Sequence, residues 1–159
     1  MEHRVGIGFD AHAFEEGLPL VLGGVAIDYT RGLAGHSDGD VITHALIDAL
    51  LGAANLGDIG SLFPSGDEQY RGASSLDLLW EAYREVRDAG FELVNADCVL
   101  VGEEPRIGPV RDEMGERLAG ALGVDVGRVT VRATTTDGLG FVGRGEGLAA
   151  HAVALLRQT

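Results

Sequence analysis

The segment DVITHALIDALLGAAN, residues 40–55, has apolar side chains at the spacing of one helical face, which predicts an amphipathic helix. The preceding residues Ser37-Asp38-Gly39 are of the polar kind expected at a helix N-terminus. His44 lies on this helix, with Asp40 and Asp48 one turn before and one turn after it on the same face. The apolar positions that carry the pattern are Ile42, Leu46, Ala49, Leu50 and Ala53.

Strands and further helices are predicted on both sides of this segment. The pattern predicts strands over residues 4–14, 91–101 and 129–134, a hairpin over 20–27 turned by Gly23-Gly24, and helices over 74–89 and 109–122. Residues 146–157 fit either a helix or a strand, because Ala and Leu favour the first and their alternation the second. The glycines of residues 4–14 suggest a close approach of the backbone to a ligand or a partner.

Length and composition limit the class of protein. The 159 residues, without repeats or low-complexity tracts, predict one α/β or α+β domain spanning residues 1–159. The formal net charge is −13, with arginine but no lysine, which argues against non-specific nucleic-acid binding and against docking on anionic membranes. A phosphorylated substrate would therefore need a local cation, either a metal ion or arginine. No segment approaches the roughly 20 apolar residues of a membrane helix, nor is there a signal-peptide pattern, so we expect a cytoplasmic protein.

Asp10, His12 and His44 are candidate metal ligands. Asp10 and His12 are two residues apart on a predicted strand, which places both side chains on one face. With His44 they would form a set of two histidines and one carboxylate with a fourth position open, as in catalytic rather than structural zinc sites. Asp40 and Asp48 are then candidate partners that orient His44. The alternatives are that His12 is a core residue and that the carboxylates around His44 form a solvated stripe.

Three further segments carry polar groups that suit a phosphorylated ligand. His36 and Ser37 lie in a Gly-containing loop whose backbone amides could meet an anion. Residues 134–137, Thr-Thr-Thr-Asp, end a predicted strand, which is a common position for phosphate ligands, although threonine also simply favours strands. Residues 58–67 are rich in turn formers, so they are either a connector or a loop that holds polyol hydroxyls. Cys98, the only cysteine, excludes an intrachain disulfide and a cysteine-based zinc site, and its apolar surroundings favour a buried, inert thiol.

Taken in order, these motifs resemble the 2-C-methyl-D-erythritol 2,4-cyclodiphosphate synthase family of the non-mevalonate isoprenoid pathway. The resemblance covers nearly the whole chain. It rests on GFDAH (8–12), HSDGDVITH (36–44), DALLGAANLGDIG (48–60), LFP (62–64), ATTT (133–136) and LGFVGRGEG (139–147).

The resemblance implies an enzyme that converts a cytidine diphosphate ester of methylerythritol 2-phosphate into a cyclic diphosphate and releases CMP. In this family the 2-phosphate of the substrate attacks its β-phosphate. Zinc ligands fall on Asp10, His12 and His44, and contacts to the transition state fall on His36 and Thr135. In this family a second ion, magnesium or manganese, bridges the phosphates. The acidic residue that holds it matches Asp137, where the family usually has Glu. Arg106 stands where the family has Lys, so its charge is kept.

The resemblance also implies how the substrate is bound and how chains assemble. The fold implied is α+β, with a mixed sheet covered by helices on one face, strand at residues 146–157, and sheets facing the axis of a homotrimer. Active sites lie between subunits, and Phe141, Arg144 and Glu146 match a central cavity for isoprenoid diphosphates. The substrate-binding positions implied are Asp10, His12, His36, Ser37, Asp58, Ile59, Gly60, Phe63, Pro64, Ser65, Gly66, Asp67, Gly102, Pro105, Arg106, Thr134, Thr135, Thr136, Asp137, Phe141 and Arg144.

Two other functions fit the same residues. One is a zinc-dependent phosphohydrolase, which needs a general base near the metal, with Asp40 and Asp48 as candidates. The other is a non-catalytic protein, either an oligomer stabilised by metal or an isoprenoid-binding trimer, which predicts a closed site of four ligands and unfolding without metal.

Overall fold

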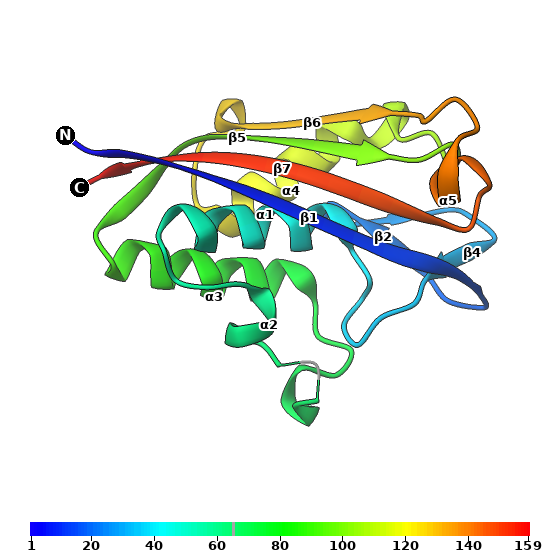
Figure 1. Ribbon diagram of the computed structural model, residues 1–159, viewed down its shortest axis with the longest axis horizontal. Helices are drawn as coiled ribbons and strands as arrows, with labels where there is room; N and C mark the ends of the chain where they lie inside the picture. The colour runs from blue at the N-terminus through cyan, green and yellow to red at the C-terminus, as the bar shows by residue number, and fades with distance from the viewer. Residues whose placement is uncertain (65) are drawn as a thin grey trace.

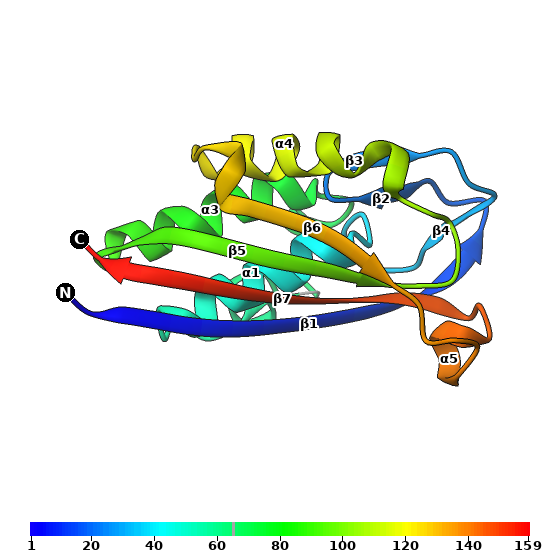
Figure 2. The same ribbon diagram turned by 90° about the horizontal axis from the view of Figure 1, so that it is seen from above.

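A five-stranded mixed sheet in the order β4-β1-β7-β5-β6 forms one layer of the computed structural model, which describes residues 1–64 and 66–159 (Figure 1). Strands β5 and β6 are parallel, and the other neighbours are antiparallel. Figure 2 shows β1, β7, β5 and β6 side by side, with both chain ends at the same end of the sheet. The strands are β1 (His3–Glu16), β4 (Arg31–Leu33), β5 (Phe91–Val101), β6 (Val129–Thr134) and β7 (Gly147–Gln158), and a separate hairpin is formed by β2 (Leu20–Leu22) and β3 (Val25–Ile27).

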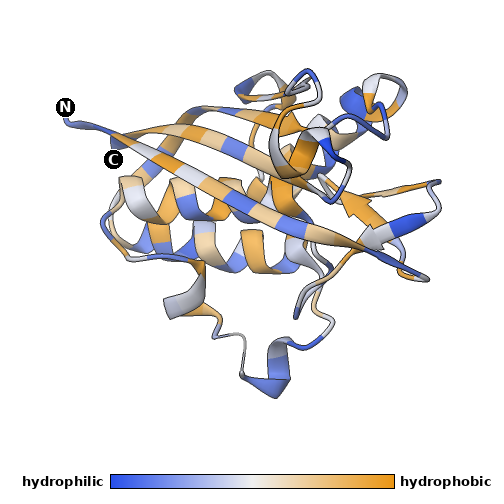
Figure 3. Ribbon diagram, turned by 45° about the vertical axis from the view of Figure 1, so that its right-hand side comes forward, coloured by the Kyte–Doolittle hydropathy of each residue, from blue (hydrophilic) through white to orange (hydrophobic). Residues whose placement is uncertain are grey.

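Helices α1 (Val41–Ala53), α3 (Ser75–Asp88) and α4 (Arg111–Leu122) form the second layer on one face of the sheet. This arrangement confirms the predicted α+β class with a mixed sheet and helices on one side. The shorter helical elements are α2 (Ile59–Leu62), α5 (Gly140–Gly143) and the 3-10 turns η1 (Glu68–Tyr70), η2 (Gly108–Val110) and η3 (Val126–Arg128). The segment that carries η1 projects from the body of the molecule and is hydrophilic (Figure 3).

Helix α1 is confirmed, but the prediction that it is amphipathic is wrong. Its side chains are buried nearly all round, with Asp48 half-buried and Gly52 exposed. The reason is that α1 packs against β1 and β7 on one side and against α3 on the other. A helix enclosed on both sides carries apolar residues on all faces. Its N-cap is Asp40, not one of residues 37–39.

Asp40 joins helix α1 to the predicted hairpin, which is also confirmed. The positive φ angles of Gly23 (56°) and Gly24 (75°) make the turn, as expected for glycines in a two-residue hairpin. The fully buried Asp40 carboxylate accepts hydrogen bonds from the amides of Gly23 (2.9 Å) and Gly24 (2.8 Å) and from the Thr43 hydroxyl (2.7 Å). Burial, together with the nearby charge of Asp38, raises the pKa of Asp40. Asp40 therefore has a structural role.

Glycines of β1 allow α1 to approach the strand closely. A Cβ at Gly8 would collide with the carbonyl oxygen of Ala45, and one at Gly6 with that of Ala49. The sequence prediction of a ligand or partner at this strand is corrected, because the close neighbour is the chain's own helix. Helix α1 therefore lies against the backbone of β1 at these two positions.

The C-terminal segment forms strand β7, although its composition favours a helix. Its even-numbered residues from Leu148 to Leu156 are buried under the helices, whereas His151 and Val153 are exposed on the other face. The segment pairs with β1 on one side and β5 on the other, and pairing on two edges outweighs the helical preference of Ala and Leu.

The remaining predicted elements agree with the structure. Helices α3 and α4 lie within one or two residues of their predicted ranges, and Gly90 and Gly123, with φ of 93° and 70°, follow their C-termini as glycine does in such caps. Cys98 is buried on β5, and burial raises its pKa to about 12, as expected for an inert thiol. Within the described residues, none of the helices has both the length and the apolar character needed to cross a bilayer.

Replacing Gly8 tests the close packing of β1 on α1. We expect Gly8→Ala to lower the free energy of unfolding by about 3 kcal/mol or more, because backbone must move to admit the methyl group. Gly52→Ala, in open space on α1, is the control and should raise stability by about 0.5–1 kcal/mol. Urea unfolding of both variants measures the difference, and equal stability of Gly8→Ala and wild type would contradict the packing argument.

Candidate metal centre

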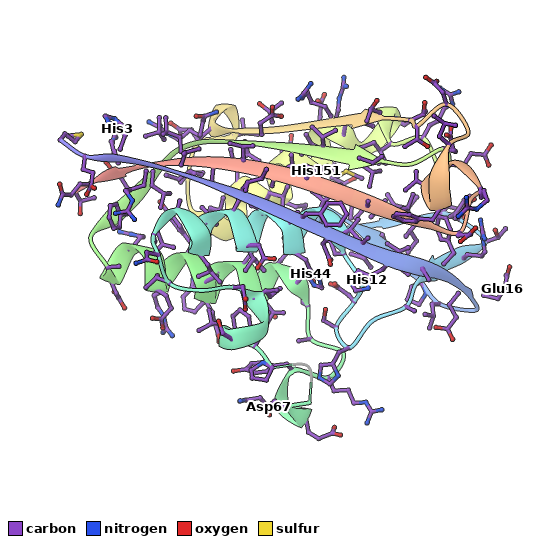
Figure 4. All side chains as sticks on the ribbon, in the orientation of Figure 1. His3, His12, Glu16, His44, Asp67 and His151 are labelled. Carbon is purple, nitrogen blue, oxygen red and sulfur yellow. The ribbon has the colours of Figure 1, made fainter. Side chains whose placement is uncertain are left out.

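Asp10, His12 and His44 converge where β1 lies against α1. One ligand atom from each residue lies within 4.8 Å of the others. Figure 4 shows His12 and His44 close together on the helix side of β1. The two-residue spacing on the strand directs Asp10 and His12 to the same side, and α1 brings His44 to meet them. Among the described residues, this set is the one group of histidines and carboxylates with metal-ligand spacing.

Hydrogen bonding leaves a nitrogen of this cluster without a partner. Asp10 Oδ2 lies 3.0 Å from His12 Nε2 and 3.1 Å from His44 Nδ1. The contact with His12 does not have hydrogen-bond geometry, so its buried Nε2 has no hydrogen-bond partner in the described structure. Burial opposes ionisation of Asp10, but the two histidines outweigh it and hold the pKa of Asp10 below its ordinary value. Asp10 in turn raises the pKa of His12.

The other nitrogen of His44 faces two serine hydroxyls. His44 Nε2 lies 2.9 Å from Ser37 Oγ and 2.8 Å from Ser75 Oγ. The prediction that Asp40 and Asp48 orient His44 is therefore wrong. The Asp40 carboxylate is used in the hairpin contacts, and the Asp48 carboxylate accepts a hydrogen bond from the amide of Ile59 at 2.7 Å. Sequence reasoning missed Ser75, because helix periodicity shows neighbours on α1 and nothing about side chains brought in from α3.

The arrangement fits a divalent metal ion. Two imidazole nitrogens and a carboxylate oxygen are a donor set suited to zinc and similar ions. The His12 nitrogen that lacks a hydrogen bond and the His44 Nδ1 both face the same carboxylate oxygen of Asp10. His36, the third histidine near this region, is not part of the cluster, so the described ligand set remains open to a further ligand.

A cavity of about 440 Å³ opens onto this cluster. Tyr70 and Leu78 also line it, and sequence reasoning missed both because neither stands in a polar motif. Asp58 and Asp67, which were predicted to bind substrate, do not line the cavity, and Ser65 lies outside the described residues. The predicted residues that do line it are Asp10, His12, His36, Ser37, His44, Ile59, Gly60, Phe63, Pro64 and Gly66.

Hydrogen bonds hold the loops around this cavity. Asp58 caps α2 by accepting from the amide of Ser61 at 2.8 Å, and Asp48 holds the next residue, Ile59, from α1. His36 Nε2 donates to the carbonyl oxygen of Asp67 at 3.0 Å. The segment predicted as a possible connector is therefore partly helical and anchored to α1.

A second cavity, of about 340 Å³, lies between the start of η2 and the end of β6. Among the described residues, it shares no lining residue with the first cavity, the metal-side cavity at the Asp10–His12–His44 cluster. Thr136 and Asp137, predicted on the same side, do not line it. The predicted residues that do line it are Gly102, Pro105, Arg106, Thr134 and Thr135, and Glu103 and Arg111 join them.

Glu103 holds the turn that follows β6. Its Oε1 accepts a hydrogen bond from the amide of Gly138 at 3.0 Å, and the Thr136 hydroxyl donates within the turn to the carbonyl oxygen of Leu139 at 2.7 Å. Asp137, in the same turn, has a positive φ of 53°, a conformation that aspartate tolerates better than most residues. Its carboxylate accepts from the Thr135 hydroxyl at 3.3 Å.

The residues predicted for a trimer cavity lie around α5. Arg144 forms an ion pair with Glu146 and lines a cavity of about 220 Å³ together with Phe14, Tyr29 and Arg31. Phe141 is exposed and does not line this cavity.

The fold and the site define a class: a small α+β protein with an open Asp-His-His cluster at the junction of a strand and a buried helix. The chain matches the YgbB family over residues 3–157. It is 59% identical to a 2-C-methyl-D-erythritol 2,4-cyclodiphosphate synthase from Moorella thermoacetica over 153 residues, which cover 96% of this chain and 94% of that protein. It is 57% identical to one from Rubrobacter xylanophilus, covering 98% and 96%. The chain belongs to the YgbB family.

Solved structures agree with this assignment. A 2C-methyl-D-erythritol-2,4-cyclodiphosphate synthase in a CDP-bound form is 41% identical, with a TM-score of 0.88, and the match covers 97% of this chain and 100% of that one. The bifunctional IspDF of Campylobacter jejuni is 46% identical, with a TM-score of 0.96, over 99% of this chain. This chain spans 43% of the length of that bifunctional protein.

Metal binding tests the cluster directly. We expect the metal-stripped protein to take up one zinc or cobalt ion per chain, and His12→Ala to weaken this affinity by at least about 100-fold, because a ligand is removed. His3→Ala is the matched control, since His3 lies on the same strand outside the cluster. Competition with a chelator measures both affinities, and equal loss in the two variants would exclude the Asp10–His12–His44 site.

Proposed function

We propose that this protein converts 4-diphosphocytidyl-2-C-methyl-D-erythritol 2-phosphate to 2-C-methyl-D-erythritol 2,4-cyclodiphosphate and CMP, with residues 1–159 acting as one domain in the cytoplasm. The observation that carries the proposal is the open Asp10–His12–His44 cluster facing a cavity, in a chain 59% identical to a synthase of this name. Gly102, Pro105, Arg106, Thr134 and Thr135 line the second cavity, beside a turn held by Glu103.

The metal proposed at Asp10, His12 and His44 is zinc. A zinc ion held there would withdraw electron density from a β-phosphate oxygen and offset its charge. The net charge of −13 repels a phosphorylated substrate at long range, and such a cation would offset this repulsion at the site. A second ion, magnesium or manganese, is proposed at Asp137, whose exposed carboxylate lies beside Thr135.

The other predicted residues position the substrate. We assign the β-phosphate to the metal side, with His36 and Thr135 contacting the transition state. We assign Ile59, Gly60, Phe63, Pro64 and Gly66, which line the metal-side cavity, to the methylerythritol unit, and Gly102, Pro105 and Arg106 to the cytidine diphosphate. The guanidinium of Arg106 suits two phosphate oxygens at once. Ser37 and residues Thr134 and Thr136 complete the polar contacts.

Positioning is the main work of such a site, because the reaction is intramolecular. An oxygen of the 2-phosphate forms a bond to the β-phosphorus, and the bond from that phosphorus to the oxygen bridging it to the α-phosphate breaks. The bridging oxygen leaves with its electron pair as part of CMP. No water is consumed.

We propose that the site is completed by a second copy of the chain in a homotrimer. The metal-side cavity and the second cavity share no residue within the described part of one chain. The sheet face opposite the helices exposes Val5 (69%), Ile7 (71%) and Phe9 (52%), an apolar surface of the kind that oligomer contacts cover. The cavity near Arg144 is a candidate for an isoprenoid diphosphate, with Phe141 exposed nearby.

The phosphohydrolase alternative has less support. A hydrolase needs a general base facing the metal-side cavity. Asp40 is fully buried in hairpin contacts and Asp48 is hydrogen-bonded to Ile59, and among the described lining residues Asp10 is the one carboxylate. The non-catalytic alternative predicts four ligands, whereas the described cluster has three.

Product analysis tests the proposed reaction. With zinc and magnesium, we expect equal amounts of CMP and a cyclic diphosphate, measured by phosphorus NMR and nucleotide chromatography. Chelation and His44→Ala should each abolish both products. CMP with a linear bisphosphate would establish hydrolysis instead. If no product forms and metal is needed only for folding, the non-catalytic alternative is favoured.

Mixed assemblies test the shared site. His44→Ala removes a group of the metal-side cavity and Thr135→Ala removes one of the second cavity, and each variant should be inactive alone. If one site takes its metal from one chain and its threonine from the next, trimers formed from equal amounts of both should recover about one quarter of wild-type activity. Co-refolding followed by the same product analysis measures this, and recovery of none would mean that each chain holds a whole site.

A further inference from the structure

A hydrogen-bonded chain links the candidate metal ligand His44 to a carboxylate outside the metal cluster. His44 Nε2 lies 2.8 Å from the hydroxyl oxygen of Ser75, the first residue of α3. The Ser75 hydroxyl is hydrogen-bonded to Asp38 Oδ1, and the Ser75 amide donates to Asp38 Oδ2 at 2.9 Å. Asp38 Oδ1 also accepts from the amide of Asp40 at 3.1 Å. Both ends of the Asp38 carboxylate are therefore fixed.

The chemistry of the three groups sets the direction of this chain. An ionised carboxylate only accepts hydrogen bonds, so the Ser75 hydroxyl donates its one hydrogen to Asp38. The Ser75 oxygen is then left to accept from His44 Nε2–H. A proton held on Nε2 leaves a lone pair on Nδ1, which is the nitrogen 3.1 Å from Asp10 Oδ2. This is the tautomer in which Nδ1 can bind a metal.

Ser37 touches the same nitrogen without this constraint. Its hydroxyl lies 2.9 Å from His44 Nε2, and no carboxylate contacts it in the described structure. A hydroxyl that is free to rotate serves either tautomer of a histidine. Ser75, rather than Ser37, therefore determines which nitrogen of His44 carries the proton.

We propose that Asp38 and Ser75 are a positioning pair that holds the proton of His44 on Nε2 and directs its Nδ1 lone pair at the metal. The inference rests on the metal site of the proposed function. Without the pair, Asp10 is the strongest acceptor near His44 and would draw the proton to Nδ1, where an incoming metal ion must displace it. Asp38 and Ser75 therefore favour a proton on Nε2 of His44, whereas Asp10 favours one on Nδ1.

Metal affinity provides the first test, with no substrate present. We expect Ser75→Ala and Asp38→Asn each to weaken zinc binding by about 10- to 100-fold in chelator competition, as other groups that orient metal-bound histidines do. The double variant should be no weaker than Ser75→Ala alone, because both residues act through one chain. Ser74→Ala is the matched control, since the exposed Ser74 makes no side-chain cap bond and should bind zinc like wild type.

Nitrogen NMR of the imidazole rings in the metal-free protein provides the second test. At a pH where His44 is neutral, wild type should carry the proton on Nε2, and Ser75→Ala should move it to Nδ1. A wild-type proton on Nδ1 overturns the proposal even if no variant folds. Wild-type zinc affinity in Ser75→Ala also overturns it, whereas failure of wild type itself to bind zinc contradicts the metal site. Thermal unfolding of each variant separates lost affinity from lost fold.

Discussion

The contact between strand β1 and helix α1 is the constraint on which the site depends. Gly8 has no side chain where the backbone of Ala45 passes, and Gly6 has none where Ala49 passes. The helix can therefore lie against the strand at a distance that any Cβ would prevent. Asp10 and His12 follow on the strand and His44 adjoins Ala45 on the helix, so the same contact that packs the core brings three ligands together.

The acidic residues around the site have separate tasks, although they lie close together in sequence. Asp40 holds the β2–β3 hairpin to α1, Asp48 holds the loop at Ile59, and Asp38 holds the first residue of α3. Each is held by backbone amides, which satisfy a buried or half-buried carboxylate at low cost. Asp10 is left as the carboxylate that faces the cavity and the two histidines.

The two faces of the sheet differ in what covers them. Helices cover one face, and the Asp10–His12–His44 cluster forms between them and β1. The other face exposes Ile7 and Phe9. The second cavity lies where β5 and β6 end. A chain with two separate cavities and an exposed apolar face fits the trimer proposed above.

Local patterns in the chain were enough to predict the three long helices, the hairpin and the shared side of Asp10 and His12, because helical spacing and strand alternation relate residues only a few positions apart. The same patterns assigned the wrong partners to His44 and left residues 146–157 undecided. Ser75 lies 31 positions from His44, and β7 is a strand because β1 and β5, both distant in sequence, pair with its two edges. Hydrogen bonds and sheet edges that join distant segments exist only after the chain has folded, so the tertiary structure alone determined them.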